Sequence, residues 1–178
     1  MTVGWQGDKV RLVPLDRERH LGNALQWLND PEVSYWLDVG DLPITRGAEE
    51  EFFRKADDPG SSDVTFAIET LEGEHVGFSG LMRIDWKSRV AYTGTVIGRH
   101  ELWGEGLGTD AAKVRSSYAF QVLGLRMLIS EVLVDNDKSR SMLVKAGYRE
   151  VARIPRRMWK RGAFRDQVIL VLESSKAS

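Results

Sequence analysis

The stretch Trp103-Gly104-Glu105-Gly106-Leu107-Gly108-Thr109-Asp110 decides the fold, because glycine stands at three alternate positions directly before a helical pattern. Apolar side chains recur after it at three- and four-residue steps, at Leu107, Ala111, Val114, Tyr118 and Val122. Lys113, Arg115 and Gln121 fall outside this series. Glycine lets the backbone come close to a ligand, and the unpaired N–H groups of a helix start point toward it. The stretch therefore predicts an anion-binding turn.

The segments around this turn read as strands. Gly124 ends the helix, and the branched apolar run Met127 to Val134 then has the length of a buried strand. Three alternating segments precede the turn and predict an antiparallel meander: Val64 to Thr70, His75 to Ile84 and Arg89 to Gly98. The local order is strand, glycine turn, helix, strand.

The rest of the chain adds elements on both sides. Before the meander we expect a near-edge strand at Val10 to Leu15, a helix at Arg17 to Asn29, and a second helix from Thr45 to about Ala56. After it we expect a short helix from Asn136 to Gly147 and two final strands, Tyr148 to Trp159 and Phe164 to Leu172. Without repeats or a long linker, residues 1–178 are predicted to form one domain.

Composition excludes several functions. Net charge is -1 and 29% of the residues are charged, so no nucleic-acid footprint is indicated. The sequence has no cysteine, which removes disulfides and a Cys nucleophile. Its three histidines have no metal-ligand spacing, so no metal is expected. No apolar run approaches the roughly 20 residues that span a bilayer, and we expect a cytoplasmic protein without membrane contact.

Three phosphate-binding motifs compete for the glycine turn. An NTPase loop needs a lysine after the last glycine, but Thr109 and Asp110 follow Gly108. A dinucleotide fingerprint needs its third glycine one residue later, although Glu131 stands about where a ribose-binding acid is found. That alternative stays open. The third candidate is the pyrophosphate of coenzyme A.

The last candidate is the one that a family resemblance supports. Trp103 to Gly108 resembles the Gln/Arg-x-x-Gly-x-Gly/Ala signature of the GCN5-related N-acetyltransferases, the GNAT family, with Trp103 in place of the usual first residue. Further motifs, Tyr118-Ala119-Phe120, Asn136-x-x-Ser139 and Gly147-Tyr148, are similar to the subgroup of RimJ/RimL ribosomal-protein N-terminal acetyltransferases. The resemblance implies an α/β (α+β) fold with a mixed, mostly antiparallel sheet of about seven strands and about four helices.

The resemblance also implies a cofactor site for acetyl-CoA, the acyl donor. Backbone amides would hold the pyrophosphate, at Trp103, Gly104, Glu105, Gly106, Leu107, Gly108 and Thr109. Asp110 would repel an anion if it faced inward, so we expect it to point away. Ile97 and Gly98 would lie beside the thioester, with the Gly98 N–H as a catalytic oxyanion donor. Asn136 would contact the pantetheine arm, although helix capping is an equally simple role for it.

The acid and base of the reaction are less well marked. Ser139 would lie near the sulfur as a catalytic proton donor, because Leu143 occupies the place of the tyrosine that many GNAT members use. Tyr148 is the second choice for that acid. The general base is open among Glu69, Asp85 and Glu131. Without a Cys nucleophile, direct transfer in a ternary complex is expected.

The acceptor depends on the variable segments. Aromatic residues there are candidates for substrate binding: Tyr35, Trp36, Trp86, Trp159 and Phe164. For Trp159 and Phe164 a cross-strand aromatic pair is an equal alternative. By resemblance the acceptor is the N-terminal amine of a protein. The alternatives are a small amine (a polyamine, amino sugar or aminoglycoside) and a non-catalytic acyl-CoA-binding module. A homodimer is compatible with the subgroup.

Overall fold

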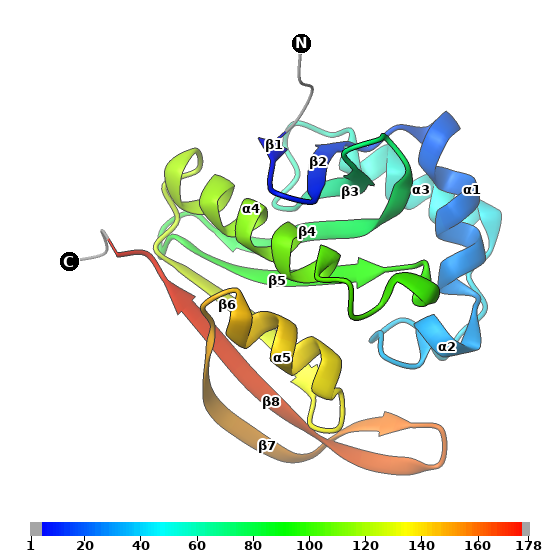
Figure 1. Cartoon of the computed structure of the whole chain (residues 1–178). Helices are drawn as coiled ribbons and strands as arrows, with labels where there is room; N and C mark the ends of the chain where they lie inside the picture. The colour runs from blue at the N-terminus through cyan, green and yellow to red at the C-terminus, as the bar shows by residue number, and fades with distance from the viewer. Residues whose placement is uncertain (1–4, 176–178) are drawn as a thin grey trace.

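The computed structural model describes residues 5–175, which form one mixed sheet flanked by helices (Figure 1). Eight strands stand in the order β1-β2-β3-β4-β5-β6-β8-β7. They are β1 (Trp5–Gln6), β2 (Val10–Pro14), β3 (Val64–Thr70), β4 (His75–Asp85), β5 (Val90–Ile97), β6 (Met127–Leu133), β7 (Arg149–Lys160) and β8 (Ala163–Glu173). All pairings are antiparallel except that of β5 with β6.

Helices cover both faces of the sheet. They are α1 (Arg17–Leu28), α2 (Pro31–Ser34), α3 (Arg46–Ala56), α4 (Leu107–Gln121) and α5 (Asp137–Lys145), with a 3-10 turn η1 at His100–Leu102. Helices α4 and α5 lie side by side on one face (Figure 1). On the other, α1 and α3 bury Leu21, Ala24 and Phe53 against Phe78 of β4. No helix within residues 5–175 is long and apolar enough to cross a membrane.

Local signals explain where these helices begin. The side chain of Asp16 accepts the Arg19 N–H at the start of α1, and the side chain of Thr45 accepts the Ala48 N–H at the start of α3. Two elements were not predicted. The short helix α2 follows an Asp30 cap with proline in its first turn, and β1 has only two residues, too few for a periodic pattern. The sheet accordingly has one strand more than expected.

The feature that positions the site is a split in the sheet. Strand β5 pairs with the parallel strand β6 only from Val90 to Tyr92, opposite Met127 to Ile129. Beyond this point the two strands continue to Ile97 and Leu133 without pairing to each other, while β5 stays paired with β4 and β6 with β8. The gap that opens is therefore a V whose closed end, which we call the apex, lies just beyond Tyr92 and Ile129.

Helix α4 packs on the core through most of the predicted apolar series, since Leu107, Val114 and Tyr118 lie against the cluster that contains Ala111. Its buried residues are Gly108, Asp110, Ala111, Ala112, Arg115, Ser116 and Ala119. Ala111 fits the apolar series, but Val122 is 58% exposed and Arg115 is fully buried. The fully buried positions are mostly small residues, and Arg115 lies among them next to the predicted apolar series.

Candidate active site

A cleft of about 550 Å³ enters the V between β5 and β6. Its walls come from β5 and β6, from the turn before α4, and from the first turns of α5. One end lies at the glycine turn, and we call it the donor end. The other reaches the segment after α1 and includes Trp36, Leu37 and Asp38, and we call it the acceptor end.

The donor end is formed by the predicted glycine turn. Gly104 and Gly106 have φ values of +92° and +84°, in the left-handed region that a side chain disfavours. Gly106 caps α4 without a side-chain hydrogen bond, so the first amides of the helix have no side-chain acceptor there. Gly108 has another role, because a Cβ there would lie 2.7 Å from Sδ of Met142 on α5. The turn thus offers a helix N-terminus to an anion.

Asp110 points away from this turn, as expected. Its carboxylate accepts the N–H groups of Asp8, Lys9 and Val10 at 3.2, 2.8 and 3.0 Å. The first two amides belong to the turn between β1 and β2, and the third is that of the first residue of β2. The carboxylate of Asp110 therefore fixes the edge of the sheet. Because its negative charge points away from the glycine turn, the positive potential of the helix N-terminus is retained there.

The first turn of α5 forms the opposite wall of the donor end. Asn136 and Ser139 both line the cleft, as the sequence suggested. The Asn136 side chain caps α5 by accepting the Ser139 N–H at 3.1 Å, so the capping role is present together with the position in the cleft. Trp103 spans the gap, since its Nε1 donates to the Ile97 carbonyl at 2.7 Å and the Lys138 ammonium lies 4.8 Å from its ring centre.

The amide that faces the gap belongs to Ile97 and not to Gly98. The Gly98 N–H donates to the Val76 carbonyl of β4 at 2.9 Å, so it cannot serve as the oxyanion donor that the sequence suggested. Hydrogen-bonding groups alternate along an antiparallel strand, which turns the N–H of Ile97 toward the open side. Gly98 is glycine for a packing reason, because a Cβ would lie 1.9 Å from the ring of Trp27.

The apex of the V carries a polar network. Arg115, fully buried, donates through Nη1 to Ser79 Oγ, the Gly94 carbonyl and Thr95 Oγ1, at 3.1, 2.9 and 2.6 Å. Its Nη2 donates to the Tyr148 hydroxyl at 3.1 Å. Tyr148, the second choice for the acid, is thus buried in this network behind the cleft lining. Sequence patterns gave no signal for Arg115.

Of the three carboxylates considered as base, Glu131 alone lines the cleft. Its side chain is 29% exposed and lies 3.9 Å from Arg83. Asp85 is exposed at the end of β4, where the Ser88 N–H at 2.9 Å lowers the pKa of its carboxyl group. The cleft lining contains no histidine among the described residues.

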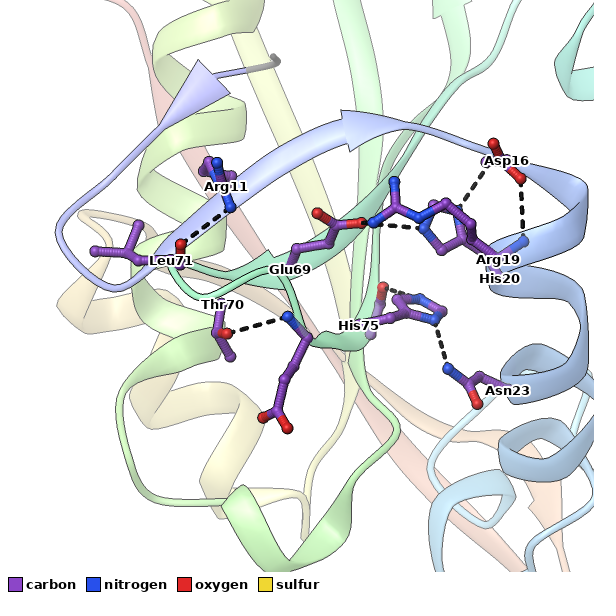
Figure 2. Close-up of polar contacts among 11 residues, drawn as sticks. Arg11, Asp16, Arg19, His20, Asn23, Glu69, Thr70, Leu71 and His75 are labelled. Atoms are coloured by element: carbon purple, nitrogen blue, oxygen red, sulfur yellow. Dashed lines mark hydrogen bonds and ion pairs between the residues drawn. The ribbon is translucent and has the colours of Figure 1, made fainter. Parts of the chain in front are cut away.

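Glu69 lies in a separate buried cluster shown in Figure 2. It accepts hydrogen bonds from Arg19 and from Nε2 of His20, whose Nδ1 accepts the Asp16 N–H. The neighbouring His75 is held between Asn23 and the Gly77 carbonyl. Burial lowers the pKa of His20, and burial together with the nearby His20 lowers the pKa of His75 to about 4. This cluster ties α1 to the sheet, away from the cleft.

The aromatic candidates separate into two groups. Trp36 lines the acceptor end, and Tyr35 stacks edge-on against it at 4.7 Å. Trp86 is exposed in the β4–β5 turn, outside the cleft lining. Trp159 and Phe164 form a cross-strand pair at 5.0 Å, also outside it. Of the five candidates only Trp36 lines the cleft, with Tyr35 packed against it.

The β7–β8 hairpin nevertheless closes the acceptor end from behind. Lys160 is 1% exposed and donates to the Leu37 carbonyl and to Asp41, the latter at 2.9 Å. Arg161 donates to the Pro31 carbonyl at 3.0 Å and lies over the ring of Tyr35. We call these contacts the hairpin latch. They hold the loop that carries Trp36 and Asp38.

A sheet split beside a glycine-rich helix start, with a cleft running through the split, defines the class of coenzyme-A-dependent acyltransferases. The sequence matches the model of the acetyltransferase (GNAT) domain over residues 9–149. The chain belongs to the GNAT family of acetyltransferases and is an acetyl-CoA-dependent N-acetyltransferase. Among residues 5–175 no group of three or more His, Cys, Asp or Glu side chains could hold a metal ion.

Solved structures share this fold at low identity. Spermidine N-acetyltransferase from Vibrio cholerae, in complex with CoA and spermine, aligns with a TM-score of 0.85 and 20% identity over 94% of this chain and 97% of that one. Mycobacterium smegmatis RimJ, in complex with CoA-disulfide, aligns with a TM-score of 0.77 and 21% identity over 94% of this chain and 83% of that one. A GCN5-related N-acetyltransferase from Brucella melitensis aligns with a TM-score of 0.75 and 25% identity over 95% of this chain and 77% of that one. No curated protein matches the sequence.

Proposed function

We propose that the acceptor is the N-terminal amine of a protein, which receives the acetyl group by direct attack in a ternary complex. The observation that carries this proposal is the acceptor end of the cleft, where Glu131 is the candidate base, Asp38 is a second carboxylate, and the described lining has no histidine. A weak base suits an amine that is partly neutral near pH 7. An α-amino group has a pKa of about 7.7 to 8.0, against about 10.4 for lysine.

Charge at the acceptor end argues against a polyamine. Asp38 and Glu131 line it, Arg83 lies beside Glu131, and Asp41 is engaged by Lys160. A polyamine carries several ammonium groups, each of which needs a partner when it leaves water. One ammonium needs only one carboxylate, and Trp36 and Met82 supply apolar surface for the residue that follows it.

The donor would lie with its pyrophosphate on the amides from Trp103 to Thr109 and its pantetheine arm between β5 and Asn136. Ile97 would donate its N–H to the acyl carbonyl as negative charge develops on the oxygen. The amine nitrogen forms a bond to the carbonyl carbon, and the carbon–sulfur bond breaks. Glu131 takes the proton from the nitrogen, directly or through water, and Ser139 donates a hydrogen bond to the departing thiolate.

Acceptor profiling tests the assignment. Steady-state kinetics with acetyl-CoA would compare peptides with a free α-amine, the same peptides blocked at the N-terminus, spermidine, and an aminoglycoside. We expect kcat/KM to be highest for the free peptides and to vanish on blocking. Faster turnover of spermidine would contradict the proposed acceptor. Binding of CoA with no turnover of any amine would point instead to a non-catalytic acyl-CoA-binding module.

A further inference from the structure

The apex network contains a buried charge that acetyl transfer does not use. Arg115 is 0% exposed, and all four of its hydrogen-bond partners are neutral. The structure gives it no ion pair within residues 5–175, and its Nε has no hydrogen-bond partner. Arginine stays protonated in proteins, so a full positive charge stands at the closed end of the cleft without a counter-ion.

The unused donors of Arg115 are arranged for a carboxylate. The hydrogens of Nη1 are taken by acceptors on β4 and β5, and Nη2 makes one hydrogen bond, to Tyr148. The Nε hydrogen and the Nη2 hydrogen beside it lie on one edge of the planar guanidinium, and the Nε hydrogen has no acceptor there. That edge is the fork that binds both oxygens of a carboxylate at once. Arg115 is therefore a buried cation that lacks a hydrogen-bond acceptor on this edge.

The position of the charge indicates which part of a ligand would reach it. The cleft runs from the glycine turn along β5, past Ile97 and Thr95, to Thr93 at the apex. Thr95 Oγ1 is itself 2.6 Å from Nη1 of Arg115. Ile97 and Thr95 are about 7 Å apart at the usual rise of a strand. An acyl carbonyl held by the Ile97 amide would thus direct a longer acyl chain toward Arg115.

We propose that the cleft prefers acyl donors whose acyl chain ends in a carboxylate, such as succinyl-CoA, over neutral donors of the same length. This inference rests on the proposed use of the cleft for acyl transfer. Succinyl transfer follows the same steps as acetyl transfer. The amine nitrogen bonds to the thioester carbonyl carbon, the carbon–sulfur bond breaks, and the amine proton passes to Glu131. The terminal carboxylate is unchanged and pairs with Arg115 throughout.

Binding measurements test the preference directly. The wild-type protein is titrated calorimetrically with butyryl-CoA and succinyl-CoA, whose four-carbon acyl chains differ in charge. CoA, which has no acyl chain, is the reference. We expect succinyl-CoA to bind about ten- to a hundredfold more tightly than butyryl-CoA, the range for hydrogen bonds to a charged group. Transfer rates to one common acceptor should show the same order. Equal affinity for the two donors in the wild-type protein overturns the inference.

Two variants assign the preference to Arg115. Arg115→Met keeps the unbranched apolar stem of the side chain without its charge, and should bring the affinity ratio of the two donors to about one. Tyr148→Phe removes one hydrogen bond of the network but keeps the cation, and should preserve the preference. Circular dichroism and the Kd for CoA check that each variant is folded. A preference that survives in folded Arg115→Met contradicts the assignment.

The same titrations separate this inference from the proposed function. Tight binding of CoA and transfer of acetyl, without a preference for succinyl-CoA, would remove only the inference about Arg115. Failure to bind CoA at all would remove the proposed function as well.

Discussion

The two ends of the cleft are made in different ways. The donor end is built from two short stretches, the turn from Trp103 to Thr109, all of which lines the cleft except Glu105, and the first turn of α5. The acceptor end is built from side chains that are far apart in the sequence, including Trp36, Met82 and Glu131, and is held by the hairpin latch from Lys160. A backbone site needs only a local conformation, whereas a side-chain site needs the whole fold to bring its parts together.

This difference suggests that one end binds a part common to all acyl donors and the other end selects the acceptor. Any acyl-CoA presents the same pyrophosphate to the donor end, so backbone amides are sufficient there. Acceptors differ in shape and charge, and loops on a rigid scaffold can vary to fit them. If this division is correct, substitutions at the two ends should change different kinetic constants.

The largest effect is expected from Glu131→Gln at the acceptor end. Loss of the base should lower kcat by about 10³-fold, within the usual range for general base catalysis, while the KM for acetyl-CoA stays unchanged. Steady-state kinetics over a range of acetyl-CoA concentrations measures both constants. Asp85→Asn is the matched control, since Asp85 lies outside the cleft lining, and it should leave kcat as it is. A Glu131→Gln enzyme with normal kcat would exclude Glu131 as the base.

Gly106→Ala should damage the donor end. A side chain at a φ of +84° is strained, and relief of that strain would move the first amides of α4. We expect kcat/KM for acetyl-CoA to fall by about 100-fold, as misplacement of about 1 Å can cause.

Gly124→Ala provides the control at the other end of the same helix. Gly124 also has a positive φ, +69°, with no neighbouring atom within 4 Å of its added Cβ. Its alanine variant should lose stability to a similar extent but keep its affinity for CoA, measured by calorimetry. Equal loss of CoA affinity in both variants would argue against a specific cradle at Gly106.

A smaller effect is expected from Lys160→Met in the hairpin latch. Release of the loop that carries Trp36 and Asp38 should raise the KM for the acceptor about tenfold and leave the KM for acetyl-CoA unchanged, a loss typical of one charged hydrogen bond. Arg149→Met removes an ion pair with Glu173 in the same hairpin, outside the cleft lining, and should change neither constant. An increase in both KM values for Lys160→Met would mean that the latch supports the whole cleft.

The smallest effect concerns stability and not the cleft. His75 has a folded-state pKa of about 4 against an ordinary value of 6.5, so its neutral form is favoured in the folded protein. Its contribution is complete above pH 6.5 and is lost as the pH falls toward 4, because the unfolded chain binds the proton first.

Urea denaturation at several pH values would measure this loss. In His75→Gln the free energy of unfolding should decline less between pH 6.5 and 4 than in the wild type. His100→Gln should follow the wild type, because the His100 side chain is 45% exposed. If His75→Gln and the wild type lose stability in parallel, another group is responsible for the decline.

The sequence was a good guide to the elements and to the glycine turn, which lies at the cleft. Helix starts at Asp16 and Thr45 were found because a cap is a local contact between neighbouring residues. It was a poorer guide where a role depends on distant parts of the chain. Gly98 was assigned to catalysis, but whether its amide is free depends on its pairing with Val76 in β4. Trp159 and Phe164 were candidates for substrate binding, with a cross-strand pair as an equal alternative, and they form that pair outside the cleft lining.

Arg115 is the clearest case of a residue whose environment its helix pattern does not reveal. A charged side chain is usually exposed, and Arg115 lies outside the apolar series predicted for α4. The most deeply buried face of the helix nevertheless carries mostly small residues, among them Ala111, Ala112 and Ala119, and Arg115 lies in it. A run of small residues at helical spacing would have been the signal for that face.

By itself the sequence determined the order of elements and the glycine turn, because both follow from local conformation and from the spacing of nearby residues. Tertiary structure alone decided which carboxylate faces the cleft, which amide is free, and that an arginine is buried at its apex. Those properties depend on the register of β5 against β4 and on the loss of pairing between β5 and β6 after Tyr92. Register and separation are relations between distant segments, and no single stretch of sequence contains them.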